Sequence, residues 1–92
     1  MLSDEDSALV ARAQQGDTSA FEALMVRHRD KVYGLARRMT KSEADAAEIT
    51  QETFLAAYRT LHTFRAEAAF GSWLHRIAAN FALMRLRHQK TS

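Results

Sequence analysis

Between residues 63 and 90 the chain combines aromatic rings with cationic and amide side chains, and this chemistry suits the capture of a single-stranded nucleic acid. Phe64 and Phe70 lie in a polar stretch, and Trp73, the one tryptophan, follows where a helix is expected to begin. Aromatic rings stack on unpaired bases. The alternative is that these rings belong to the hydrophobic core, as aromatic residues near the start of a helix more often do.

Polar residues recur at steps of three and four after this aromatic stretch. Arg76, Asn80, Leu83 and Arg87 share one stripe of the helix that the spacing predicts. Arginine binds phosphate, and an amide offers both a donor and an acceptor to the edge of a base. The stripe is therefore a candidate site for a nucleic-acid strand, with simple solvation as the alternative.

A second stripe, further upstream, carries carboxylates. Asp45, Glu48, Gln51, Glu52 and Leu55 follow one another at steps of three and four on a predicted helix. No lysine or arginine lies between residues 42 and 52. We expect these acids to be without a basic partner inside the domain, which is unusual for a helix that only needs to be soluble.

The net charge of +2 hides an alternation along the chain. The segments 1–22, 23–41, 42–52 and 53–92 carry net charges of −4, +5, −4 and +5. Such blocks indicate two different partners, one basic and one polyanionic. The alternative is that the blocks pair with each other in the fold.

No arrangement of residues points to an enzyme, a metal or a cofactor. The four histidines, His28, His62, His75 and His88, include no pair at the helical spacing of a zinc site, and there is no cysteine. Glycine-rich phosphate loops and nucleophile elbows are absent from the sequence. We expect a non-enzymatic domain without cofactors, in which His28 is a half-buried structural residue.

The composition is that of one small helical domain, covering residues 1–92. There is no proline, and only three glycines interrupt a sequence rich in good helix formers. No apolar run is long enough for a membrane helix, and the acidic N-terminus is not a signal peptide. We expect no membrane insertion and a cytoplasmic location.

The periodicity predicts an all-α fold, a compact bundle of about four helices with a loop before the last one. The helices are expected at about residues 4–15, 18–39, 43–61 and from 71 or 72 to 88, with the loop at 62–72. The apolar faces that should build the core are Phe21, Leu24, Val32, Leu35 and Met39, then Ala46, Ile49, Thr53, Phe54, Ala57, Tyr58 and Leu61, then Leu74, Ile77, Phe81 and Met84.

Three segments, in this order, carry a resemblance to a known family. They are LVARAQQGDTSAFEALMVRHRDKVYGLA, DAAEITQETFLAAYR and TFRAEAAFGSWLHRIAAN. The second and third segments are specific, because their combination is improbable by chance. It consists of an acidic helix with Gln-Glu, then Phe-Arg, then Trp-Leu-x-Arg-Ile-Ala-x-Asn. From about Ser7 to Gln89 the chain resembles the region 2 domain of a bacterial RNA polymerase sigma factor of the extracytoplasmic-function (ECF) type.

The resemblance implies a protein partner for the acidic stripe. In the family this helix docks on the clamp helices, a coiled coil in the largest subunit of core RNA polymerase. The matching residues here are Glu48, Gln51 and Glu52, with Leu55 as an apolar neighbour. An anti-sigma factor often covers these surfaces in the family, so we expect such a partner as well.

The resemblance also implies promoter DNA as a ligand of the loop and last helix. In the family they recognise the −10 promoter element and capture its non-template strand as single-stranded DNA. The matching residues are Phe64, Arg65, Phe70, Trp73, Arg76, Asn80 and Arg87. Arg85 is a further candidate for a phosphate contact.

The chain departs from the family at several positions. Ala66 stands where the family often has glycine, and Met84 where it often has aspartate. The family's second DNA-binding domain, a helix-turn-helix that reads the −35 element, is expected to be absent, so that the module alone binds weakly. The competing hypothesis is a helical protein-interaction domain that binds no DNA.

Overall fold

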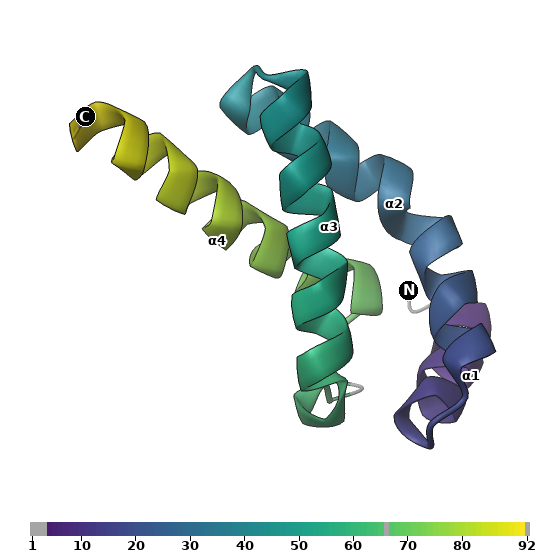
Figure 1. Cartoon of the computed structure of the whole chain (residues 1–92). Helices are drawn as coiled ribbons and strands as arrows, with labels where there is room; N and C mark the ends of the chain where they lie inside the picture. The colour runs from purple at the N-terminus through teal and green to yellow at the C-terminus, as the bar shows by residue number, and fades with distance from the viewer. Residues whose placement is uncertain (1–3, 66, 92) are drawn as a thin grey trace.

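The computed structural model describes residues 4–65 and 67–91, with side chains from residue 6 to residue 89 in these ranges, and it shows helices joined by short connections (Figure 1). They are α1 (Asp4–Gln14), α2 (Thr18–Thr40), α3 (Glu43–Thr60), the 3₁₀ turn η1 (Leu61–Thr63) and α4 (Phe70–Thr91). No strand occurs in these ranges. The predicted all-α bundle with a loop before its last helix is confirmed, while Ala66 lies outside the described residues.

The largest boundary differences concern the last helix. It begins at Phe70 rather than at Gly71 or Ser72, because the backbone N–H of Trp73 already donates to the carbonyl of Ala69 at 3.1 Å. It is helical to Thr91 rather than to His88. Within the described ranges, no helix is both long and apolar enough to cross a bilayer.

Asp17 determines where α2 begins. Its Oδ1 accepts hydrogen bonds from the backbone N–H groups of Ser19 and Ala20, at 3.0 and 3.2 Å, and its Oδ2 accepts from Arg12 Nη2 at 2.8 Å. The hydrogen bond from Ser19, followed by that from Arg12, lowers the pKa of Asp17 from 3.8 to about 2. One carboxylate thus caps α2 and binds the end of α1.

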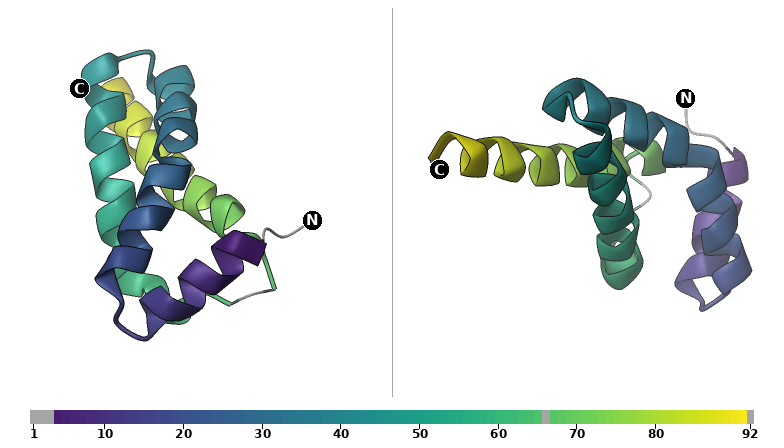
Figure 2. Two further views of the ribbon diagram at one scale, coloured as in Figure 1. Left: turned by 90° about the vertical axis from the view of Figure 1, so that its right-hand side faces the viewer. Right: turned by 45° about the horizontal axis from the view of Figure 1, so that its top comes forward.

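A tight turn separates α2 from α3. Lys41 adopts the left-handed conformation with φ of 57° and donates its backbone N–H to the carbonyl of Arg37 at 2.9 Å. Ser42 then caps α3 by accepting from the N–H of Asp45 at 3.2 Å. Because the turn is so short, α2 and α3 form a hairpin, visible in both views of Figure 2.

Helix α4 packs against both arms of this hairpin (Figures 1 and 2). Small residues line the contact, since Ala36, Ala46, Ala57, Ala78 and Ala82 have no exposed surface. Larger core residues fill the space between them, namely Leu24, Val32, Ile49 and Leu74. Fully buried alanines allow three helices to approach closely, so α4 is seated with one side inward and one side outward.

Two predictions of the core were wrong. Tyr58 and Met84 each expose more than half of their surface. Tyr58 lies at the edge of the α2–α3 contact, where its ring meets that of Phe21 edge-on at 5.1 Å. The helical spacing had placed both residues on an apolar face, but each lies past the margin of the face that the neighbouring helices cover.

The loop before α4 is closed by an aromatic cluster of Phe64, Phe70 and Trp73. The ring centroids lie 5.5 Å apart for Phe64–Phe70, 5.1 Å for Phe64–Trp73 and 5.7 Å for Phe70–Trp73. Phe64 is 8% exposed and Phe70 is 3% exposed. Both phenylalanines therefore belong to the core, and only Trp73 keeps part of its ring at the surface.

Two polar residues from earlier helices hold this loop in place. Gln14 donates to the backbone carbonyls of Leu61 and Phe64, at 3.0 and 3.1 Å. The ring of His28 lies edge-on to Phe70 at 5.6 Å. At Gly71 a Cβ would lie 3.3 Å from His28 Cε1, so the absence of a side chain allows α2 and α4 to meet here. The sequence predicted His28 as a half-buried structural residue, and the structure places it among the buried polar residues.

We predict that Asp17→Ala destabilises the domain in a pH-dependent way. Because the folded-state pKa lies below the ordinary value, the carboxylate stabilises the fold above about pH 4, and this effect is lost as the pH falls towards about 2. The melting temperature of the variant should lie below that of the wild type at pH 7, and the two should converge in acid. Circular dichroism measures both, with Asp30→Ala as the control. A difference that stays constant with pH would contradict the assignment.

We also predict that Phe64 contributes to stability as a core residue. Phe64→Ala should lower the free energy of unfolding by about 3–5 kcal/mol, and Phe64→Leu by roughly a third of that. His62→Ala, at an exposed neighbouring position, should change it by less than about 0.5 kcal/mol. Chemical denaturation gives these values. Equal stability of the Phe64 and His62 variants would show that the Phe64 ring is not part of the core.

Candidate protein and nucleic-acid interfaces

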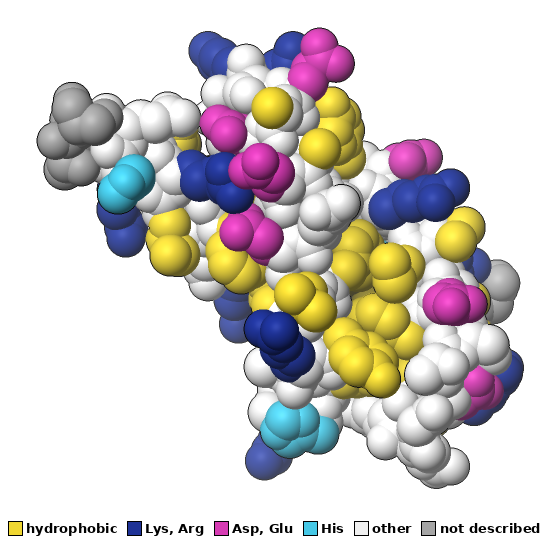
Figure 3. Space-filling model, viewed as in Figure 1, with side chains coloured by type: hydrophobic (Ala, Val, Ile, Leu, Met, Phe, Trp, Pro, Cys, Tyr) yellow, Lys and Arg dark blue, Asp and Glu magenta, His cyan; other side chains and the backbone are white. Residues whose placement is uncertain are grey.

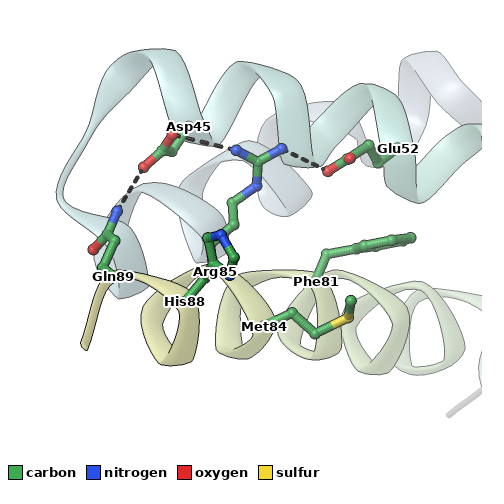
Figure 4. A pocket seen from close by; sticks show the side chains of 7 residues that line it. All are labelled: Asp45, Glu52, Phe81, Met84, Arg85, His88 and Gln89. Carbon is green, nitrogen blue, oxygen red and sulfur yellow. Dashed lines mark hydrogen bonds and ion pairs between the residues drawn. The ribbon is translucent and has the colours of Figure 1, made fainter. Parts of the chain in front are cut away.

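Three carboxylates of α3 surround one guanidinium of α4. Arg85 Nη1 donates to Asp45 Oδ1 at 3.3 Å and to Glu48 Oε1 at 2.9 Å, while Arg85 Nη2 donates to Glu52 Oε1 at 3.0 Å. Gln89 Nε2 adds a bond to Asp45 Oδ2 at 3.3 Å. Figure 4 shows Arg85 reaching from α4 between Asp45 and Glu52. We call Asp45, Glu48 and Glu52 the acidic cluster.

The expectation that these acids have no basic partner was wrong. Their partner is Arg85, which lies 33 to 40 residues later in the chain and comes close only when α4 packs on α3. The hydrogen bond from Arg85 to Glu52 raises the pKa of the arginine, so it stays charged. Three carboxylates still exceed one guanidinium, and the side chains of Glu48 and Glu52 remain 62% and 43% exposed. The acidic cluster therefore keeps a surplus of negative charge at the surface.

The other two residues of the predicted protein-binding stripe border an apolar groove. Gln51 and Leu55 lie on its α3 wall, and Leu55 is half-exposed. The groove has a volume of about 580 Å³ between α2 and α3, and its lining consists of Thr18, Phe21, Glu22, Met25, Arg29, Thr50, Gln51, Phe54, Leu55 and Tyr58. In Figure 3 acidic side chains lie along α3 and an apolar hollow opens between α3 and α2. One surface of α3 thus offers both charge and an apolar slot.

The predicted nucleic-acid stripe divides between surface and core. Arg76, Asn80 and Arg87 are exposed along α4, and Arg65 is exposed in the loop before it. Phe64 and Phe70 are buried, so their rings are covered by the protein in this conformation. Trp73 is half-buried against them. The structure therefore presents three cations, one amide and the accessible part of one indole ring.

Arg85 does not share the position of these exposed cations. It follows the stripe in sequence, but its guanidinium lies against α3 in the acidic cluster. Arg85 was a candidate for a phosphate contact, but its guanidinium is engaged with carboxylates instead. The alternating charge blocks allowed such internal pairing, but which cation meets these acids depends on how α4 crosses α3.

A second ion pair holds α1 to α2 behind the loop. Asp6 Oδ2 lies 2.9 Å from His28 Nε2, and Asp6 Oδ1 accepts from Arg27 Nε at 2.8 Å. Burial raises the pKa of Asp6, but the hydrogen bonds from Arg27 and His28 outweigh it and lower the pKa below its ordinary value. His28 thus connects Asp6 of α1 to Phe70 at the start of α4, which positions the nucleic-acid stripe.

His75 lies close to this network on α4. Burial, with the positive charges of His28, Lys31 and Arg38, lowers the pKa of His75. Its Nε2 is buried without a hydrogen-bond partner. Among the described residues, no group of three or more histidine, aspartate and glutamate side chains has the arrangement that would hold a metal ion.

Known proteins with similar sequences indicate the family of this chain. Residues 24–91 match the family described as Sigma-70 region 2. The ECF RNA polymerase sigma-E factor of Haemophilus influenzae is 49% identical over 77 residues, which are 84% of this chain and 40% of that protein. The RNA polymerase sigma-H factor of Pseudomonas aeruginosa is 40% identical over 82 residues, which are 89% of this chain and 42% of that protein. The chain thus spans about two fifths of the length of these relatives.

Two solved structures share the arrangement of helices. An engineered region 2 of sigmaE, in complex with GTAAAA, matches with a TM-score of 0.84 and 41% identity over 97% of this chain and 95% of that one. CnrH, in complex with the cytosolic domain of CnrY, matches with a TM-score of 0.80 and 35% identity over 86% of this chain and 51% of that one. The region matched, the identities and the shared helical arrangement agree, and the chain belongs to the sigma-70 region 2 family.

Proposed function

We propose that this domain is a module for transcription initiation, which docks on core RNA polymerase through α3 and captures the non-template strand of the −10 promoter element through the loop and α4. One observation carries the proposal: exposed groups of opposite chemistry lie on two neighbouring helices. An acidic cluster beside an apolar groove lies on α3, and three arginines with one asparagine lie on α4 and its loop. A basic protein and a polyanion are the partners that such surfaces fit.

The α3 surface suits the clamp helices of the largest polymerase subunit. An apolar side chain of a partner helix can enter the groove beside Leu55 and Tyr58, while its basic neighbours meet Glu48 and Glu52. Apolar contact supplies affinity, and the charges determine orientation and the rate of encounter. Glu48, Gln51, Glu52 and Leu55 are therefore the residues we assign to polymerase binding.

The α4 surface suits an opened DNA strand. Extruding a base costs a few kcal/mol of stacking, which contacts to the protein must offset. We assign Asn80 to the edge of a base, Arg65, Arg76 and Arg87 to phosphates, and the accessible side of Trp73 to stacking. Phe64 and Phe70 are assigned to support of the loop, since both rings are buried. The relative bound to GTAAAA supports this assignment, because it shares 41% of its residues with this chain.

A protein-interaction domain that binds no DNA is the second candidate function. The apolar groove favours it, since such a slot accepts a helix from any suitable partner. CnrH, which matches this chain with a TM-score of 0.80, is in complex with a segment of another protein, CnrY. We therefore propose that an anti-sigma factor competes for these surfaces in the cytoplasm.

We predict that Glu52→Lys weakens binding to the clamp coiled coil by at least about tenfold, because it removes an attractive charge and adds a repulsive one. Isothermal titration of the isolated coiled coil against the folded variant measures this effect. Asp30→Lys makes the same change of charge on the exposed side of α2 and should alter binding by less than about twofold. Unchanged affinity in the Glu52 variant would contradict the docking assignment.

We predict that Asn80→Ala lowers affinity for a single-stranded oligonucleotide containing GTAAAA but not for a scrambled one. The loss should be about five-fold to a hundredfold, the value of a base contact of about 1–3 kcal/mol. Fluorescence anisotropy with both oligonucleotides at low salt measures it. Equal losses on the two sequences would show that Asn80 does not read a base.

A salt titration of the same complexes separates the two candidate functions. Affinity should fall steeply between 50 and 200 mM salt, on the order of tenfold or more, if several arginines contact phosphates. Failure to bind either oligonucleotide at low salt would favour the protein-interaction domain.

A further inference from the structure

The acidic cluster already holds a basic side chain in the position that a docking partner would need. Arg85 contacts Asp45, Glu48 and Glu52 at 3.3, 2.9 and 3.0 Å. A partner's arginine or lysine that approached the same carboxylates would find Glu48 and Glu52 already sharing a cation. Docking through these acids and the internal contact of Arg85 are therefore in competition.

The contact is built so that it can be exchanged. Glu48 and Glu52 are well exposed, and the Arg85 side chain is itself 27% exposed. Ion pairs of this exposure contribute little to stability, since water and salt screen them. The carboxylates can therefore pass from Arg85 to a partner's cation without disturbing the buried alanine contact between α3 and α4.

The contact of Arg85 with the carboxylates also borders an open groove, from which a partner's side chain can approach. The groove has a volume of about 380 Å³, and its lining is Asp45, Glu52, Phe81, Met84, Arg85, His88 and Gln89. Figure 4 shows Phe81 and Met84 on α4 next to Arg85.

We propose that Arg85 is an internal competitor for the basic side chains of the partner that docks on α3, and that docking displaces it from Glu48 and Glu52. The proposal rests on the docking function proposed above. It adds that this chain weakens its own docking surface. Affinity for a basic partner is therefore set by an intramolecular contact as well as by the interface.

Arg85→Met tests the proposal, because methionine keeps an apolar stem while it frees the three carboxylates. We expect the folded variant to bind the clamp coiled coil about threefold to tenfold more tightly than the wild type at low salt. Arg85→Lys, whose single ammonium cannot span three carboxylates, should give a smaller gain. Arg38→Met removes the same charge from α2, away from the cluster, and should leave affinity within about twofold.

The outcomes are distinct. Tighter binding of Arg85→Met but not of Arg38→Met supports the competition. If the wild type binds and neither Arg85 variant binds more tightly, the competition is overturned while the docking function stands. If the wild type itself fails to bind, both are overturned. Should Arg85→Met fail to fold, Arg85→Lys and the NMR signal of the wild-type Arg85 Nε–H provide the test, since that signal must shift when the coiled coil is added.

Discussion

The close crossing of α4 over the α2–α3 hairpin is the constraint on which the other features depend. It is possible because alanines occupy the contact and because Gly71 leaves room for the ring of His28. With Leu74, Ala78 and Ala82 turned inward, the helical period directs Arg76, Asn80 and Arg87 outward. The same crossing brings Arg85 to the flank, where it meets α3. The packing of α4 on the hairpin thus determines which charged side chains are exposed on both candidate surfaces.

The aromatic cluster shows how the loop before α4 is held against the core. Burying a phenylalanine ring is worth about 2–3 kcal/mol, which is comparable to stacking it on a base. In the free domain, burial is the interaction that is available, so Phe64 and Phe70 turn inward and pack edge-on against each other. Gln14 donates to the carbonyls of Leu61 and Phe64 and so ties the loop to α1. Specific contacts are then left to polar side chains and to the accessible part of Trp73.

The charge pattern of the chain has two uses in the fold. Some charged residues form ion pairs within the domain, namely Arg12 with Asp17, Arg27 with Asp6, and Arg85 with the acidic cluster. The remainder stays at the surface, where carboxylates on α3 and arginines on α4 face solvent. The guanidinium of Arg85 lies among the carboxylates of Asp45, Glu48 and Glu52 and so reduces the repulsion between these like charges on α3. The sequence presents internal pairing and partner binding as alternatives, and the structure shows that internal pairing still leaves charges of both signs exposed for the partner binding that we propose.

Much of this protein follows from local patterns in its sequence. Hydrophobic periodicity and the absence of proline were enough to predict the helices to within a residue or two at most ends, because these signals act over a few turns of one helix. The stripes Glu48–Leu55 and Arg76–Arg87 were equally visible, since residues three and four apart always share a helical face. Tyr58 and Met84 show the limit of this reasoning: periodicity gives a direction, but only the neighbouring helix decides how far its cover extends. The tertiary structure alone decided that Phe64 and Phe70 are buried, that Gln14 ties the loop, and that Arg85 pairs with acids more than 30 residues away. Each of these contacts joins segments that are distant in the chain. The spacing of residues within one helix does not predict which distant segment will pack against it.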